Sequence, residues 1–355
     1  MQLHSIYINF SMQDQQVFSN WIKRSLPLWA KTSDALKLDA LAGDAGFRRY
    51  FRVNTKPSLI AVNSPPTKEK NPEYVRLSLF LQAQGLFTPK IYAVNYQHGY
   101  MLLEDFGAKL FSQQLEIDTP SQLYNQAEKE LLKIQQATIK VPSIPLHDAI
   151  KMSEELALFE QWFLNIMLDY QPSADEKILL DDFFKFLISN AEQQPQVLIH
   201  ADYHSRNLMM LDQHKLGVID FQDAMLGAIT YDLVSLLKDC YVCRPESWVE
   251  ARALAYKQHL ESAGLLDSID DSEFLQWFDL MGMQRHIKVL GIFSRLALRD
   301  SKDGYLKDIA LVVHYCLEAS NKYPQAAKFN NWFKEKILPV LAQQTWYCDS
   351  KGAQK

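Results

Sequence analysis

The sequence has few cysteines and lacks the usual glycine-rich phosphate-binding templates. Four cysteines among 355 residues do not make a disulfide framework. Cys240 and Cys243 form a C-x-x-C pair, but no second pair completes a zinc site, so two thiols near a helix end are the simpler interpretation. Neither G-x4-G-K-[ST] nor G-x-G-x-x-G occurs, and the chain has no internal repeat. Disulfide-stabilised, zinc-ribbon and P-loop proteins are therefore disfavoured.

Long basic blocks and long apolar runs are also missing. The net charge is −5 and positive charge is dispersed, so a nucleic-acid partner is not expected. No apolar run approaches the roughly 18–20 residues that span a bilayer, so no membrane association is expected. The first twelve residues lack the basic region and apolar core of a signal peptide. These absences predict a cytoplasmic protein.

What is present is an ordinary globular composition, with 48% hydrophobic and 12% aromatic residues. The length exceeds what one hydrophobic core usually serves, so two lobes are expected. Apolar periodicity and turn signals predict a sheet-rich first hundred residues. Helices are expected at 13–31 and 71–85, and strands at 38–42, 47–53, 59–62, 91–94 and 100–103.

The remainder is predicted to be mainly helical. Helical patterns cover 121–139, 153–170, 175–194 and most of 230–342, with short apolar runs at 197–199, 208–210 and 216–219. The chain is therefore expected to have an α+β fold with a small antiparallel-sheet N-lobe and a larger helical C-lobe. The N-lobe is placed at 1–105 and the C-lobe at 106–355.

The most informative stretch lies between two of these short apolar runs. It reads His200-Ala201-Asp202-Tyr203-His204-Ser205-Arg206-Asn207, and Asp220 follows the third run. Buried strands on both sides would make this polar loop stiff, which suits catalytic placement. A D-x4-N pair alone is common by chance and would be read as a polar surface loop. The complete pattern between three apolar runs is far more specific.

This arrangement resembles the aminoglycoside phosphotransferase branch of the protein-kinase-like superfamily. That branch carries an H-x-D-x-H-x-x-N loop followed by an I-D segment, matched here by Ile219-Asp220. The resemblance implies an ATP-dependent, Mg²⁺-dependent kinase in which Asp202 takes the acceptor proton while Asn207 and Asp220 hold the metal. It also implies that His200 and Asp232 support the catalytic loop. An exposed carboxylate at a helix N-terminus is the alternative for Asp232.

The predicted nucleotide side is in the N-lobe. Gly43, Asp44, Ala45, Gly46 and Phe47, with Arg49, lie where a loop covering the phosphates is expected, although a plain hairpin turn fits these residues as well. The hinge that bonds adenine through its backbone is expected around Glu104. The third strand lacks the lysine that kinase-like N-lobes normally carry there. The candidate replacements are Arg48, Arg49, Lys68 and Lys70.

A narrower resemblance concerns the acceptor. The segment 43–52, GDAGFRRYFR, is similar to the GDASFRRYFR segment of bacterial cell-wall amino-sugar kinases, and segments at 64–66, 219–224, 229–237 and 283–291 match as well. Gly46 stands where serine is usual. Those enzymes phosphorylate the anomeric hydroxyl of N-acetylmuramate and N-acetylglucosamine, so a small sugar substrate is implied. His204, Asp223 and Arg285 are the candidate sugar contacts, with a turn role as the alternative for Asp223.

The late helix carries a further candidate feature. At 100° per residue, Arg285, Lys288, Arg295 and Arg299 fall on one side, which would suit an anionic sugar such as N-acetylmuramate. A solvated helix face is the competing interpretation. His286 projects to the apolar side and is expected to be a buried structural residue.

Two other functions remain open from the sequence. One is a different small-molecule kinase of the same fold, such as an aminoglycoside phosphotransferase, whose polycationic substrate would favour an acidic pocket. The other is a non-catalytic nucleotide-binding module, for which the missing third-strand lysine is the sequence support.

Overall fold

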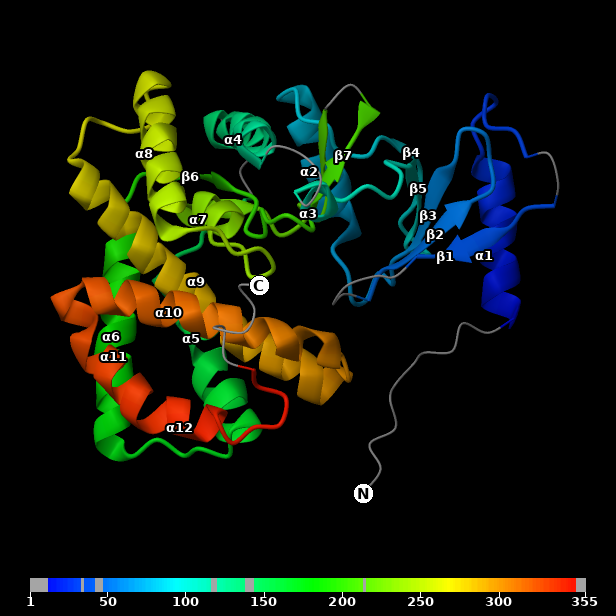
Figure 1. The fold of residues 1–355 in the computed structure, drawn as a ribbon. Helices are drawn as coiled ribbons and strands as arrows, with labels where there is room; N and C mark the ends of the chain where they lie inside the picture. The colour runs from blue at the N-terminus through cyan, green and yellow to red at the C-terminus, as the bar shows by residue number, and fades with distance from the viewer. Residues whose placement is uncertain are drawn as a thin grey trace. The chain divides into compact units, whose positions relative to one another are not determined.

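The structure is a computed structural model that describes residues 12–32, 35–41, 47–115, 120–137, 144–212 and 215–348. The chain divides into two compact units (Figure 1). The N-terminal unit comprises Met1–Gln114 and Leu208–Gln222, and the C-terminal unit comprises Leu115–Asn207 and Asp223–Lys355. The N-terminal unit thus includes residues 106–114 and a later hairpin, both of which lie beyond the predicted lobe boundary at residue 105. That boundary stays a prediction.

A five-stranded antiparallel sheet with strand order β1-β2-β3-β5-β4 forms the centre of the N-terminal unit. Helix α1 covers one face of this sheet (Figure 1). A separate hairpin, β7-β8, also belongs to the unit. The elements are α1 (Met12–Ser25), β1 (Leu38–Ala40), β2 (Arg49–Val53), β3 (Leu59–Asn63), α2 (Asn71–Ala83), β4 (Ile91–Asn95), β5 (Tyr100–Glu104), α3 (Phe111–Gln114), β7 (Leu208–Met210) and β8 (Leu216–Val218).

Alternation along the strands explains the packing of this sheet. Phe18 of α1 contacts Phe51 and Tyr100, with ring centroids 5.7 and 4.8 Å away, so these residues share the covered face. Helix α1 is shorter than the predicted 13–31, because Pro27 disfavours helical geometry in the residue before it. Each predicted N-lobe strand is present, and no strand end is shifted by more than two residues.

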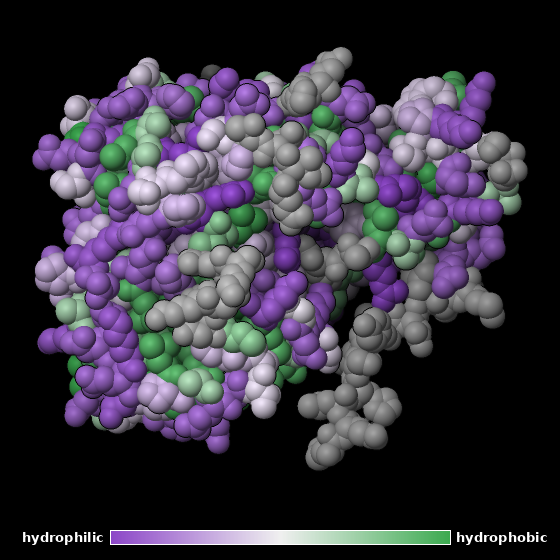
Figure 2. Space-filling view, viewed as in Figure 1, coloured by the Kyte–Doolittle hydropathy of each residue, from purple (hydrophilic) through white to green (hydrophobic). Residues whose placement is uncertain are grey.

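The C-terminal unit is a bundle of helices packed around the 30-residue helix α9. Its two strands, β6 and β9, pair antiparallel. On the face that Figure 2 displays, hydrophobic residues lie in separate patches among hydrophilic ones. The elements are α4 (Pro120–Gln136), α5 (Ala149–Leu158), η1 (Phe159–Met167), α6 (Ala174–Glu192), β6 (Gln196–Ile199), β9 (Met225–Ala228), α7 (Tyr231–Leu237), α8 (Glu246–Ser262), α9 (Asp271–Asp300), η3 (Asp303–Asp308), α10 (Ile309–Lys322), η4 (Pro324–Ala326), α11 (Ala327–Trp332), η5 (Phe333–Ile337) and α12 (Leu338–Leu341).

Glycine allows α9 to approach its neighbour closely. A Cβ atom placed on Gly291 would lie 2.4 Å from the backbone carbon of Leu158, at the junction of α5 and η1. The predicted helix 153–170 is in fact two segments, since the π-helical turns of η1 continue α5. The prediction of an α+β fold with a sheet-rich N-terminal part and a helical C-terminal part is confirmed.

Candidate active site

The loop between β6 and β7 is held in a compact conformation by its own hydrogen bonds. The amide nitrogen of His204 donates to the Asp202 carbonyl (2.9 Å), and that of Asn207 donates to the His204 carbonyl (2.9 Å). The Asn207 side chain also donates, through Nδ2, to the Asp202 carbonyl oxygen (3.0 Å). This last bond fixes the orientation of the amide and leaves its Oδ1 as an available oxygen ligand.

Asp232, in the first turn of α7, anchors the beginning of this loop. Its Oδ2 accepts from the backbone nitrogen of His200 (2.5 Å) and its Oδ1 from that of Ala201 (3.1 Å). Ala201 has φ = 73°, a left-handed conformation that non-glycine residues rarely adopt. Desolvation raises the pKa of the fully buried Asp232 carboxyl to about 6, against the lowering effect of His200 and of these two bonds. The backbone contacts that the resemblance implied for Asp232 are therefore present.

A second buried carboxylate, which the sequence reasoning missed, anchors the other end of the loop. Asp239 accepts through Oδ2 from the backbone nitrogen of Ser205 (2.9 Å) and through Oδ1 from that of Tyr241 (3.0 Å). Asp239 follows Asp232 by seven residues, which is about two helical turns. Helix α7 ends at Leu237, however, so this spacing does not place Asp239, and no local signal in the sequence marks it as an anchor.

The Asp202 side chain remains accessible within this rigid loop, with 57% of its surface exposed. Its Oδ1 lies 3.7 Å from Nη2 of Arg285 and 3.9 Å from Nε2 of His204. Desolvation raises the pKa of Asp202, but the positive charges of His204, Arg285 and Lys288 outweigh it, so the pKa lies below its ordinary value. Asp202 is therefore an anionic, accessible carboxylate beside a buried guanidinium.

His200, the histidine predicted to support the loop, is internal. His200 is 1% exposed, and its Nδ1 faces the backbone nitrogen of Asp202 at 3.2 Å. His204 packs edge-on against Tyr241, whose ring is also covered by the Arg206 guanidinium at 3.5 Å. Asp223, the remaining predicted sugar contact, is exposed.

The predicted basic side of the late helix is not a continuous stripe. Arg285 is 3% exposed and directs Nη1 toward Sγ of Cys240 (3.4 Å). Lys288 donates to Glu155 (2.9 Å) and to the Tyr231 hydroxyl (3.0 Å). A solvated helix face is therefore wrong for these two residues. Lys288 is ion-paired with Glu155 of α5, whereas the buried Arg285 contacts a neutral thiol and keeps its charge beside Asp202.

His286 is buried and structural, as predicted. It is 1% exposed, and Nε2 lies 3.0 Å from the Lys238 carbonyl oxygen. Burial, together with the neighbouring Arg285 charge, lowers its pKa to about 3, so the ring is neutral at physiological pH. Cys240 and Cys243 are free thiols, and no cluster of three or more His, Cys, Asp or Glu suited to a metal occurs among the described residues.

Asp220 belongs to the N-terminal unit, where it follows β8. It has φ = 64°, and its Oδ1 accepts from Nε2 of Gln222 (2.9 Å). The next residue, Phe221, stacks on Tyr74 of α2 with ring centroids 5.0 Å apart. The Asp220 charge also reaches Tyr50 of β2, whose pKa is raised to about 12, chiefly by burial. Asp220 is thus near Tyr50 of β2 and Tyr74 of α2.

The predicted phosphate loop is only partly described. Gly43, Asp44, Ala45 and Gly46 lie outside the described residues. The backbone nitrogen of Phe47 donates to Oε1 of Glu69 (2.9 Å), and Arg49 pairs with Asn63 across β2 and β3. Strand β3 has no lysine, as the sequence already states.

The hinge region after β5 is tied to β2 by an ion pair. Nε of Arg52 lies 2.6 Å from Oδ2 of Asp105, and Nη2 lies 3.0 Å from Oδ1. The same Nη2 donates to the Gly107 carbonyl (2.8 Å). This fork geometry fixes the chain immediately after the strand that was expected to contact adenine.

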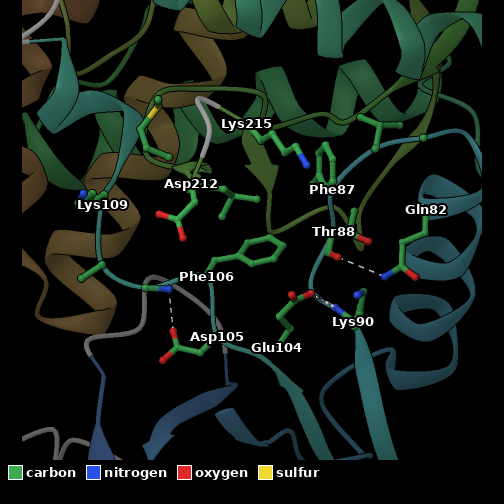
Figure 3. A pocket seen from close by; sticks show the side chains of 16 residues that line it. Gln82, Phe87, Thr88, Lys90, Glu104, Asp105, Phe106, Lys109, Asp212 and Lys215 are labelled. Carbon is green, nitrogen blue, oxygen red and sulfur yellow. Dashed lines mark hydrogen bonds between the residues drawn. The ribbon is translucent and has the colours of Figure 1, made fainter. Parts of the chain in front are cut away.

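A cavity of about 860 Å³ lies beside this hinge, within the N-terminal unit. Figure 3 shows the side chains that line it. The Glu104 carboxylate lies in it and accepts from the backbone nitrogen of Lys90 (3.2 Å). The cavity wall carries both charges, with Lys90, Lys109 and Lys215 near Glu104, Asp105 and Asp212. Because the side chain of Glu104 lines this cavity, any contact of Glu104 with adenine would come from its backbone.

Along the described residues, no helix has both the length and the apolar character needed to cross a bilayer.

The sequence model of the phosphotransferase enzyme family matches residues 37–266, which is more than half of the chain. The chain therefore belongs to the phosphotransferase enzyme family, and the resemblance found in the sequence is confirmed.

Curated relatives are similar over most of the chain. The N-acetylmuramate/N-acetylglucosamine kinase of Pseudomonas putida is 34% identical over 84% of this chain and 88% of that protein. The protein with the same name from Neisseria meningitidis serogroup B is 33% identical over 89% of this chain and 94% of its own length.

Solved structures support the fold. The ethanolamine kinase of Plasmodium vivax has a TM-score of 0.61 at 13% identity, covering 88% of this chain and 92% of that one. An ADP-bound aminoglycoside phosphotransferase has a TM-score of 0.56 at 14% identity, covering 86% of this chain and 99% of that one. At these identities the similarity shows the fold alone.

Proposed function

We propose that this protein is an ATP-dependent sugar kinase that phosphorylates the anomeric hydroxyl of N-acetylmuramate and N-acetylglucosamine, as a step of peptidoglycan recycling in the cytoplasm. The observation that carries the proposal is an accessible carboxylate, Asp202, on a loop anchored by Asp232, in a chain about one-third identical to kinases named for these two sugars.

The acceptor chemistry fits the base. In our proposal Asp202 takes the proton of the anomeric hydroxyl, the sugar oxygen bonds to the γ-phosphorus, and the bond from that phosphorus to the bridging oxygen breaks to release ADP. Positive charge around Asp202 makes it a weak base. A hemiacetal hydroxyl is more acidic than an ordinary alcohol because the ring oxygen withdraws charge, so it needs less help from a base.

The residues proposed to hold Mg²⁺ are chemically suited to it. Asn207 and Asp220 offer an amide oxygen and a carboxylate, the hard oxygen ligands that Mg²⁺ prefers, and phosphate oxygens and water usually complete its shell. The fixed orientation of the Asn207 amide supports this assignment. A magnesium ion bound there would neutralise phosphate charge, which is the main requirement in phosphoryl transfer.

The charges around Asp202 favour an amino sugar over an aminoglycoside. The guanidinium of Arg285 stands beside the base, and Lys288 adds positive charge. A polycationic antibiotic would be repelled at this position, whereas the lactyl carboxylate of N-acetylmuramate would not. The electrostatics therefore support the acidic sugar as a substrate.

A substrate panel tests the proposal. Purified protein with ATP and Mg²⁺ is offered N-acetylmuramate, N-acetylglucosamine, kanamycin, and the 1-O-methyl glycoside of N-acetylglucosamine. Phosphate transfer is expected to the two free sugars, with an acid-labile product, and not to the methyl glycoside, which has no anomeric hydroxyl. Transfer to kanamycin alone would establish the antibiotic-kinase alternative, and ATP binding without transfer to any acceptor would establish the non-catalytic one.

The role of Asp202 is tested with a matched pair of variants. Asp202→Asn is expected to lower kcat by about 10²–10⁴-fold, the usual contribution of a general base. Asp181→Asn, which changes an exposed carboxylate on α6, is the control and is expected to keep full activity. Equal activity of the two variants would refute the role given to Asp202.

A further inference from the structure

The absence of a lysine from β3 leaves the phosphate charge of ATP without its usual protein partner. Protein kinases place that lysine on the third strand and pair it with a glutamate of the following helix. The described part of the N-terminal unit contains a different buried pair in the corresponding region. Nη2 of Arg48, just before β2, lies 3.1 Å from Oε2 of Glu69, two residues before α2.

Strand geometry places Arg48 on the side of the sheet where a third-strand lysine would project. Tyr50 pairs with Val62 across β2 and β3, and alternate residues of a strand share a face. Phe51 packs on α1, so Tyr50 and Arg48 face the other way. The Arg48 guanidinium indeed lies 5.2 Å from the ring centroid of Tyr74, on α2.

Arg48 is a buried cation with donors to spare. Only 6% of its side chain is exposed. Although Nη2 is close to Glu69, neither Nε nor Nη2 makes a well-directed hydrogen bond with any group that the structure describes. Leaving charged donors unmet in a buried place costs free energy, and arginine is suited to grip phosphate oxygens with two nitrogens at once.

Three other basic residues named from the sequence are less suited. Arg49 is on the α1 side of β2, by the same alternation that places Arg48 opposite. Lys68 and Lys70 are exposed, so water screens their charge. Arg52 shares the face of Arg48, but its guanidinium is occupied by Asp105 and Gly107.

Asp220 lies near the same place. Phe221, the residue after Asp220, stacks on the ring of Tyr74, and the Arg48 guanidinium lies 5.2 Å from the centroid of the same ring, so the proposed metal ligand and the buried cation both lie near Tyr74. We propose that Arg48, held by Glu69, is the phosphate-binding cation of the nucleotide site and takes the place of the third-strand lysine. This assignment rests on the proposed function, because it presumes that ATP binds here.

The test compares nucleotides with and without phosphates. Calorimetric titration gives the Kd of a non-hydrolysable ATP analogue and of adenosine for the wild type, Arg48→Gln, Arg48→Lys and the double variant Arg48→Gln/Glu69→Gln. Arg24→Ala, at an exposed position of α1, is the matched control and is expected to bind as the wild type does.

Loss of charged hydrogen bonds predicts that Arg48→Gln weakens the ATP analogue by about 10- to 100-fold while adenosine changes by less than about twofold. Arg48→Lys is expected to lie between it and the wild type, since lysine keeps the charge but loses the fork. The double variant no longer leaves Glu69 unpaired, so it separates folding from phosphate binding, and it is expected to stay weak for the ATP analogue.

Wild-type affinity of the double variant for the ATP analogue would overturn the inference, because Arg48 would then serve only to neutralise Glu69. Equal losses for the analogue and adenosine in every Arg48 variant would also overturn it, since they would mean general distortion. A wild-type protein that binds neither compound would refute the proposed function itself, and the inference with it.

Discussion

Replacement of Asp232 should separate the geometry of the catalytic loop from the chemistry of its base. Asp232→Ala leaves the backbone nitrogens of His200 and Ala201 buried without an acceptor. Each unmet donor costs roughly 1–3 kcal/mol, giving about 2–6 kcal/mol for the pair. The loss is partly offset because burial raises the Asp232 pKa to about 6, so the ionised carboxylate is itself costly in the folded state. We expect a net loss of about 2–4 kcal/mol in the free energy of unfolding.

The isosteric variant Asp232→Asn is the sharper perturbation. Its amide oxygen can accept from one backbone nitrogen, but its NH₂ group must face the other donor, so one bond is lost at roughly 1–3 kcal/mol. Ala201 would then relax from its left-handed conformation, and Asp202, its neighbour, would move. Misplacement of a catalytic group by about 1 Å costs on the order of 10²-fold in rate.

The assay measures kcat and both KM values at a temperature well below the melting point of the variant, with urea denaturation in parallel. We expect kcat to fall by about 10²-fold while the KM for ATP changes little. Asp181→Asn again serves as the control, because its carboxylate is exposed on α6. A folded Asp232→Asn protein with wild-type kcat would refute the reasoning that this carboxylate positions the base.

Two further predictions concern helix α9. Alanine normally stabilises a helix relative to glycine by about 1 kcal/mol, and Gly282→Ala should follow this rule because its new Cβ would meet nothing closer than 3.4 Å. Gly291→Ala should instead destabilise by about 1–3 kcal/mol, since its Cβ would lie 2.4 Å from the Leu158 backbone; equal urea midpoints for the pair would contradict this packing. Burial lowers the pKa of His286 to about 3, below its unfolded value of about 6.5. The contribution of the neutral ring to the free energy of unfolding is therefore complete above pH ~6.5 and is lost as the pH falls toward 3. Over that window His286→Gln should reduce the pH slope of the unfolding free energy by about 1.4 kcal/mol per unit, and parallel curves for variant and wild type would count against a neutral buried ring.

The elements of the fold could be predicted because their signals are local. Alternation and helical spacing identified every strand of the N-terminal sheet and most helices, while the end of α1 followed the position of Pro27. The junction of α5 and η1 could not be predicted in this way. Its π-helical turns depend on packing against α9, which lies more than a hundred residues further along the chain.

The candidate site was predictable where a motif carried it and not where partners are distant. Asp202 and Asn207 stand out because polar residues interrupt two apolar runs. The ion pair of Lys288 could not be predicted from helical periodicity, since its partner Glu155 is 133 residues away in sequence. Arg52 and Asp105 are 53 residues apart, and the local sequence around neither residue predicts their ion pair.

The path of the chain has a practical consequence for anyone preparing fragments of this protein. The N-terminal unit is discontinuous, because the β7-β8 hairpin joins it from Leu208–Gln222 after the chain has passed through 93 residues of the other unit (Leu115–Asn207). No single cut yields both units intact, so limited proteolysis or a simple truncation near Gln114 would expose apolar surface on whichever piece lost its partner strand. Separate production of the N-terminal unit would require a designed linker that replaces residues 115–207 and connects α3 directly to the β7-β8 hairpin.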